Sequence, residues 1–124
     1  MREPASLPGR EGHPEVVVDL DAITANAAAL VAHVRGARLM AVVKSDGYGH
    51  GLVPTAAAAV AGGASWLGVV QIADALALRA AGFTVPVVCL LAAPDARHEE
   101  AVAADIDLTV GTAAVAAQVA AAAR

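Results

Sequence analysis

Residues 39–51, LMAVVKSDGYGHG, join an apolar run to a lysine and then to glycines at alternate positions. The run is short and continuously apolar, which is typical of a strand buried on both faces. Gly47, Gly49 and Gly51 predict a tight turn, because glycine reaches positive φ without steric cost. Residues 53–63 continue as a helix, with a proline near its first turn and glycines at its end. The stretch therefore predicts one strand–turn–helix unit.

Similar units fill most of the chain. We predict strands over residues 38–43, 66–70, 85–91 and 107–110, each followed by a helix, over residues 53–63, 72–82, 94–104 and 112–123. Short apolar strands that alternate with helices indicate an α/β fold with a parallel sheet. Four such units are half of a closed (β/α)₈ barrel, and they also suit an open doubly wound sheet. Periodicity alone does not separate these two folds.

The N-terminal part is organised differently. Residues 1–14 hold three prolines and two glycines, which predicts a mobile tail, and residues 15–124 form the expected domain. Residues 15–20, EVVVDL, are β-branched and predict a strand. Residues 21–34 carry apolar side chains at helical spacing, and Asp21 is the expected N-cap of that helix.

Composition narrows the class of protein. At 124 residues the chain fits one domain, and its hydrophobic content of 58% excludes general disorder. The net charge of −4 provides no basic stripe, and the aromatic content of 2% provides no surface on which bases could stack. Both observations argue against a nucleic-acid-binding protein. The single Cys89 fits a reducing compartment, and no apolar run is long enough for a signal peptide or a membrane span. We expect a soluble cytoplasmic protein without nucleic-acid or membrane partners.

Lys44 is the only lysine in the chain and directly follows an apolar strand. In both candidate folds, ligand chemistry lies at this carboxyl end of the strands. A desolvated lysine amine forms Schiff bases with carbonyl compounds. The glycine-rich loop and the helix after it suit an anion, and Tyr48 can donate to a phosphate oxygen. Taken alone, the loop matches neither common phosphate-binding glycine motif, so a solvent-facing lysine beside a tight turn remains an open alternative.

The quoted residues carry a resemblance to a known family. Residues 41–51, AVVKSDGYGHG, closely resemble the pyridoxal-phosphate lysine motif of alanine racemases, written AVVKA(D/N)(A/G)YGHG. Residues 16–26 are similar to the opening VDLDAI-x-x-N segment of that family. Residues 67–91 are similar to its segment EAL-x-LR-x-x-G-x-x-x-PI-x-VL. The resemblance extends in unbroken order across residues 15–111.

The resemblance implies a fold, a reaction and a cofactor. The fold is the N-terminal half of a TIM-type barrel, and the reaction is the interconversion of L- and D-alanine for peptidoglycan precursors. Lys44 forms the internal aldimine with pyridoxal 5′-phosphate and is one of two acid/base groups. Tyr48 hydrogen-bonds the cofactor phosphate, and Val42 and Leu90 pack near the cofactor. No metal ion is expected.

Two departures and several alternatives accompany this resemblance. Ser45 replaces an alanine, and Leu91 stands where a glycine often ends the third strand, so that its larger side chain is expected to crowd the cofactor or a neighbouring loop. The family's enzymes are longer homodimers, in which a tyrosine from the partner subunit is the second acid/base group. We therefore expect a truncated N-terminal part that associates and has little activity alone. A racemase for serine or a basic amino acid, and a non-catalytic remnant or assembly module, are the alternatives.

The remaining candidate side chains are interpreted as structural. Cys89 and Trp66 are expected in the core. His50 is expected to order the loop after Lys44, and His98 is expected to be solvated on an exposed helix face.

Overall fold

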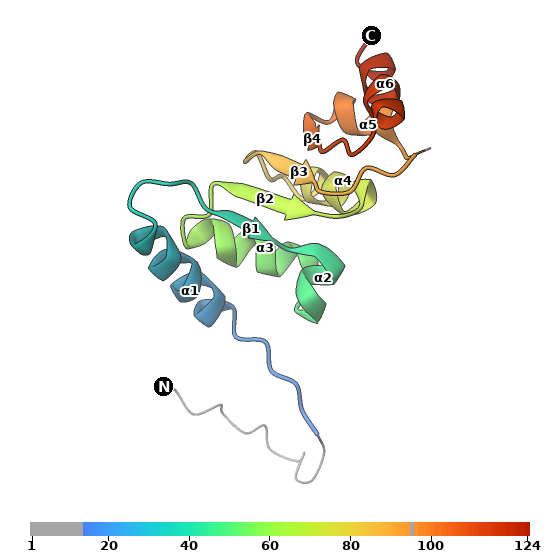
Figure 1. Cartoon of the computed structure of the whole chain (residues 1–124). Helices are drawn as coiled ribbons and strands as arrows, with labels where there is room; N and C mark the ends of the chain where they lie inside the picture. The colour runs from blue at the N-terminus through green and yellow to red at the C-terminus, as the bar shows by residue number, and fades with distance from the viewer. Residues whose placement is uncertain (1–13, 95) are drawn as a thin grey trace.

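The structure is a computed structural model that describes residues 14–94 and 96–124 (Figure 1). The predicted tail, residues 1–14, lies outside the described residues apart from Pro14. The strands are β1 (Met40–Val42), β2 (Trp66–Val69), β3 (Val87–Cys89) and β4 (Ile106–Leu108). The helices are α1 (Leu20–His33), α2 (Lys44–Gly49), α3 (Leu52–Ala61), α4 (Ile72–Ala80), α5 (His98–Ala103) and α6 (Ala113–Ala122). Among the described residues, no helix is both long and apolar enough to cross a membrane.

The four strands form one parallel sheet in the order β1-β2-β3-β4. Figure 1 shows them side by side in that order. A doubly wound sheet reverses its strand order at a switch point, whereas the strands of a (β/α)₈ barrel follow one another around the barrel. The consecutive order therefore confirms the N-terminal half of a TIM-type barrel and excludes the doubly wound alternative for these strands.

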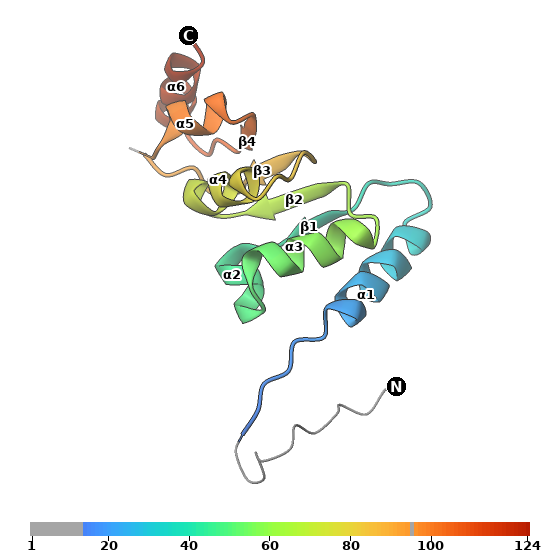
Figure 2. The ribbon, with the colours of Figure 1, turned by 180° about the vertical axis from the view of Figure 1, so that it is seen from behind.

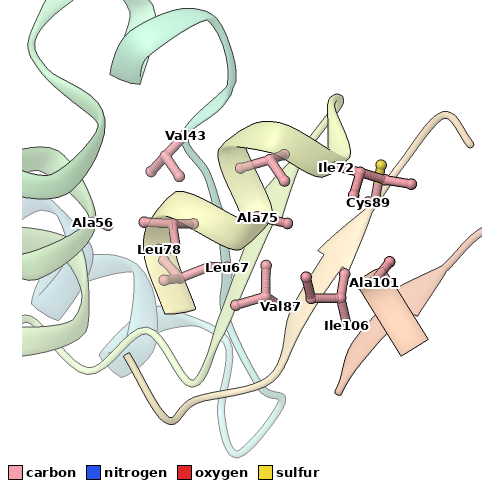
Figure 3. Close-up of a cluster of buried hydrophobic side chains, with 11 residues drawn as sticks. Val43, Ala56, Leu67, Ile72, Ala75, Leu78, Val87, Cys89, Ala101 and Ile106 are labelled. Atoms are coloured by element: carbon pink, nitrogen blue, oxygen red, sulfur yellow. The ribbon is translucent and has the colours of Figure 1, made fainter. Parts of the chain in front are cut away.

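One face of the sheet is covered by helices and forms the core. Alternate strand residues point to this face, among them Leu67, Val87 and Ile106, which lie side by side in the register of the sheet. They pack against α4 and α5, whose contacting residues include the fully buried Leu78 and the small alanines drawn in Figure 3. Alanine at these contacts lets helices approach the sheet closely, which explains how an alanine-rich chain builds a core.

The other face, which we call the open face, carries Met40 and Val42 of β1, Gly68 of β2 and Leu90 just after β3. A Cβ on Gly68 would lie 3.1 Å from Met40 Sδ and 3.3 Å from Val42 Cγ2. In a closed barrel this face becomes the lumen. Trp66, which was expected in the core, is instead half-buried on this face, and the Arg38 guanidinium carbon lies 5.4 Å from its ring centroid. The expectation for Trp66 was wrong, because strand alternation points its side chain away from the helices.

The predicted strand over residues 15–20 is also wrong. Residues 14–19 are neither helical nor in a strand, and Val16 is 92% exposed. Strand propensity reflects packing on a neighbouring strand, and no described residue pairs with this segment. α1 begins at Leu20 with Asp19 as its N-cap, where Asp19 Oδ1 accepts a hydrogen bond from the Ala22 N–H at 3.0 Å. Asp21, the predicted cap, lies in the first turn.

α1 packs against α3 beside the sheet, as both views show (Figure 2). The Thr24 hydroxyl donates to the Ala58 carbonyl across this contact at 3.1 Å. The two helices are close there, because a Cβ on Gly62 would lie 2.4 Å from the Thr24 carbonyl oxygen. α3 is thereby fixed between α1 and the sheet, which matters for the loop that precedes it.

The amino ends of the strands are tied together by Arg79 of α4. Its guanidinium donates to the backbone carbonyls of Phe83, Val85, Ala104 and Asp105 at 2.7–3.0 Å. These carbonyls belong to the loops that enter β3 and β4, so a single side chain fixes both connections.

α5 differs from its prediction in length and burial. It spans His98–Ala103, whereas the predicted helix covered residues 94–104. His98 is only 6% exposed, so its assignment as a solvated residue was wrong. α5 packs against α6, and His98 lines a cavity together with Gln118 and Ala121 of that helix, while Arg97, Glu99 and Glu100 are exposed as expected.

Candidate active site

Lys44 directly follows β1 at the carboxyl end of the sheet. The preceding residue, Val43, is buried in the core, and its N–H donates to the Gly68 carbonyl at 2.8 Å. Alternation along β1 places Met40 and Val42 on the open face, and Lys44 follows at the carboxyl end of the strand. The Lys44 side chain is half-buried there, at the edge where TIM-type barrels hold their active sites.

The backbone after Lys44 forms a left-handed turn over residues 45–48. Ser45, Asp46, Gly47 and Tyr48 have φ of 54°, 54°, 62° and 57°, with ψ between 36° and 51°. Each non-glycine residue in this conformation costs about 1–2 kcal/mol. Such strain persists only where surrounding contacts impose it, and it clusters at functional sites. The sequence predicted positive φ at the glycines of this loop, but not at Ser45, Asp46 and Tyr48.

Contacts with α3 and within the loop hold the left-handed turn. Gly47 is buried so close to Thr55 that a Cβ would lie 2.7 Å from Thr55 Oγ1. Asp46 Oδ1 accepts from the Leu52 N–H at 2.8 Å, in the first turn of α3. His50 Nδ1 lies 3.0 Å from the Gly47 carbonyl oxygen, which agrees with the loop-ordering role expected of it. The turn is thus fixed to the first part of α3.

Lys44 and Tyr48 flank the left-handed turn and lie near each other. Lys44 Nζ is 6.0 Å from the Tyr48 ring centroid, and Tyr48 is 59% exposed. A cleft of about 520 Å³ adjoins Lys44. Its lining comprises Lys44, Ser45, Asp46, Val70, Gln71, Asp74 and Leu91. Leu91, the expected source of crowding, is 69% exposed and lies on this lining.

Val42 and Leu90 lie together on the open face, on the strand side of Lys44. A Cβ on Gly68 would be 3.3 Å from Val42 Cγ2 and 3.5 Å from Leu90 Cδ1, so both side chains lie over this glycine. They form an apolar floor, which we define as Val42, Gly68 and Leu90. The structure thus brings Val42 and Leu90 together on one face of the sheet, with Lys44 and Tyr48 at its carboxyl edge.

Cys89 belongs to the opposite face and takes no part in this arrangement. Its side chain is fully buried in the helix-covered core, as predicted, and its Sγ–H donates to the Val70 carbonyl at 2.9 Å. Burial raises the pKa of the thiol, with a smaller opposing effect from a backbone hydrogen bond.

Sequence reasoning missed two residues of this region. A glycine within an apolar strand indicates close approach of other groups, and Gly68 shows that signal. Asp46 stands in a turn shortly before a helix, where aspartate often accepts backbone N–H bonds. Both signals are present in the sequence, but neither identifies the contacting residues, which include Val42 and Leu90 for Gly68 and Leu52 for Asp46.

Comparisons with known proteins agree with this geometry. Residues 18–124 match the family model described as alanine racemase, N-terminal domain. The chain is 55% identical over 108 residues to an alanine racemase of Frankia casuarinae, covering 87% of this chain and 28% of the relative. It is 53% identical over 98 residues to that of Thermobifida fusca, covering 79% and 26%.

Solved structures give the same result. The alanine racemase of D-cycloserine-producing Streptomyces lavendulae superposes with a TM-score of 0.82 at 47% identity, covering 85% of this chain and 28% of that one. The Bacillus anthracis alanine racemase with bound L-Ala-P gives 0.69 at 38% identity, covering 75% and 24%. The chain thus spans about a quarter of the length of these relatives. Because the family model covers nearly all of the described residues, the chain belongs to the alanine racemase family.

Proposed function

We propose that this chain supplies the pyridoxal-phosphate lysine site of an alanine racemase, which interconverts L- and D-alanine for peptidoglycan precursors. The observation that carries the proposal is the placement of Lys44. The only lysine of the chain stands at the carboxyl end of β1, beside a strained turn and 6.0 Å from the Tyr48 ring. Membership of the family supports the same assignment.

The residues present fit pyridoxal phosphate in their chemistry. Lys44 offers an amine to the aldehyde carbon, and the exposed Tyr48 offers a hydroxyl to the phosphate. The apolar floor offers a surface for the pyridine ring, because Gly68 has no side chain of its own and Val42 and Leu90 lie over it. The adjoining cleft of about 520 Å³ is within the size range of small-molecule sites.

Each residue then has a defined task. When bound, pyridoxal phosphate withdraws electrons from the substrate α-carbon, so that its proton becomes removable. Lys44 Nζ would hold the cofactor and would carry the α-proton on one face of the substrate. The Tyr48 hydroxyl would donate to the phosphate. Val42 and Leu90 would supply apolar surface that excludes water from the bound cofactor.

Racemisation also needs a proton donor on the opposite face, and the proposal assigns only one of the two groups, Lys44, to this chain. We propose that the whole protein is a cytoplasmic homodimer in which the partner subunit supplies the second group. Because the chain spans only 28% of the relative in Frankia casuarinae, we expect little or no racemase activity from these residues alone.

Leu91 does not decide the substrate. Its exposed side chain lies on the cleft that adjoins Lys44, but that lining also includes the polar Ser45, Asp46, Gln71 and Asp74. Membership of the family supports alanine over serine or a basic amino acid, the alternative substrates within the same reaction class.

An absorbance titration with pyridoxal phosphate tests the site. We expect the wild-type chain to develop the band of a lysine-bound cofactor at saturating concentration. Lys44→Arg keeps the charge but is expected to abolish the band. Tyr48→Phe is expected to weaken affinity by at least about tenfold, the loss of one hydrogen bond to a charged group. A band of equal strength in Lys44→Arg would refute the assignment. No band in the wild type would leave the non-catalytic module as the function.

A further inference from the structure

Asp46 connects the left-handed turn to the helix behind it. Its side-chain Oδ1 accepts from the Leu52 N–H at 2.8 Å, and its backbone carbonyl accepts from the Gly51 N–H at 2.9 Å. The residue itself has φ 54° and ψ 45°, a conformation that aspartate tolerates better than most residues. Asp46 therefore holds both the start and the end of the loop that separates Lys44 from α3.

The helix that receives this bond is a fixed reference. Ala56 of α3 is fully buried, and the helix is packed between α1 and the sheet. Its N-cap position is occupied by Gly51, which offers no side chain for capping. The Asp46 carboxylate thus takes the place of a capping side chain from six residues upstream.

The carboxylate serves the helix and not the amine. Within residues 14–94 and 96–124, no ion pair joins Asp46 to Lys44, and the Arg97–Glu100 pair is the salt bridge of that part of the chain. Asp46 lies in the turn between Lys44 and Tyr48, so any shift of its backbone changes the distance between their side chains. The hydrogen bond to Leu52 opposes such a shift.

We propose that Asp46 is a positioning residue: by capping α3 from within the left-handed turn, it fixes Lys44 and Tyr48 at the spacing that pyridoxal phosphate requires. The inference rests on the proposed function for its ligand, but the coupling of the turn to α3 is a property of the chain itself.

Three substitutions separate the two roles of the residue. Asp46→Asn keeps an acceptor oxygen and the tolerance of positive φ. Asp46→Gly keeps the backbone freedom but removes the acceptor. Asp46→Ala removes both. Asp19→Ala is the matched control, because Asp19 makes the same kind of capping bond, at 3.0 Å to the Ala22 N–H, in a helix outside the site.

The first measurement is the dissociation constant for pyridoxal phosphate, by absorbance titration of each variant. We expect Asp46→Asn to stay within about twofold of the wild type, since the cap is retained. Asp46→Gly is expected to bind about fivefold more weakly, the value of one lost cap, and Asp46→Ala more weakly still. Asp19→Ala is expected to bind like the wild type. Equal affinity in Asp46→Gly and the wild type, or equal losses in Asp46→Gly and Asp19→Ala, would overturn the proposal.

The second measurement needs no cofactor and so separates this inference from the proposed function. Amide NMR of the cofactor-free chain is expected to show faster hydrogen exchange at Leu52 and shifted Lys44–Tyr48 resonances in Asp46→Gly. Both changes are expected to be absent in Asp46→Asn and Asp19→Ala. If the resonances of the turn do not move in Asp46→Gly, Asp46 does not position Lys44. If they move while the wild type binds no pyridoxal phosphate, the coupling stands and the proposed function fails.

Discussion

Replacing Gly47 by alanine tests whether packing against α3 imposes the left-handed turn. The new Cβ would lie 2.7 Å from Thr55 Oγ1 and 2.9 Å from Thr55 Cβ, closer than real Cβ contacts come. Gly49→Ala is the matched control, because Gly49 also has positive φ, 82°, but nothing lies within 4 Å of its added Cβ. The two variants share the backbone strain and differ in the steric contact.

The magnitudes follow from these two terms. Placing alanine at positive φ costs about 1–2 kcal/mol, which is the whole effect expected for Gly49→Ala. Gly47→Ala adds the cost of overpacking, about 1–3 kcal/mol, so we expect a total loss of about 2–5 kcal/mol. The Thr55 side chain is on a packed helix and the clash reaches its Cβ, so rotation of the side chain does not relieve it.

Urea unfolding followed by far-UV circular dichroism measures both free energies of unfolding. Pyridoxal phosphate affinity, measured in parallel, is expected to fall further for Gly47→Ala than for Gly49→Ala. Equal losses of stability in the two variants would refute the reasoning, since the contact with Thr55 would then contribute nothing.

Three further predictions concern other parts of the molecule. Arg79→Met is expected to lower the free energy of unfolding, measured in urea, by about 3 kcal/mol, because four backbone carbonyls lose a charged donor. A loss of stability no larger than that of an ordinary surface substitution would contradict the role of Arg79. Cys89 is expected to react with thiol reagents far more slowly in the native chain than in urea. Burial blocks access of the reagent and raises the pKa of the thiol, so less thiolate is present at neutral pH. Equal rates in the two conditions would show that Cys89 is not in the core. Gly68→Ala is expected to cost only about 1 kcal/mol, because the nearest atom, at 3.1 Å, is the flexible end of Met40. The same change is expected to weaken pyridoxal phosphate binding by raising the apolar floor, and unchanged affinity would exclude the floor from the cofactor site.

The barrel strands were predictable because each has both a strand signal in its own residues and a neighbouring strand to pair with. Residues 38–43, 66–70 and 85–91 are short apolar runs bounded by turns, and each contains a strand of the sheet, while the predicted strand 107–110 overlaps β4 (Ile106–Leu108). Residues 15–20 carry an equally strong β-branched signal but have no partner among the described residues. Propensity indicates which segments can pair, whereas pairing depends on segments distant in the sequence.

The candidate site was predictable in its residue types but not in its geometry. The position of Lys44 after an apolar strand predicted its place at the carboxyl edge of the sheet. The positive φ of Ser45, Asp46 and Tyr48 was not predictable, because α3 imposes it through Thr55 and Leu52. Trp66 and His98 were assigned to the wrong environments for the same reason, since the packing of neighbouring elements decides which side of an element is covered.

The central claim is that the fold makes Lys44 the pyridoxal-phosphate residue, and reductive trapping tests it most directly. The chain is mixed with pyridoxal phosphate, reduced with borohydride and mapped by peptide mass, once folded and once in urea. The chain has one lysine, so the competing amine is the N-terminus. We expect a pyridoxyl label concentrated on Lys44 in the folded chain, with that preference lost in urea. A label divided between the two amines alike in both conditions would contradict it.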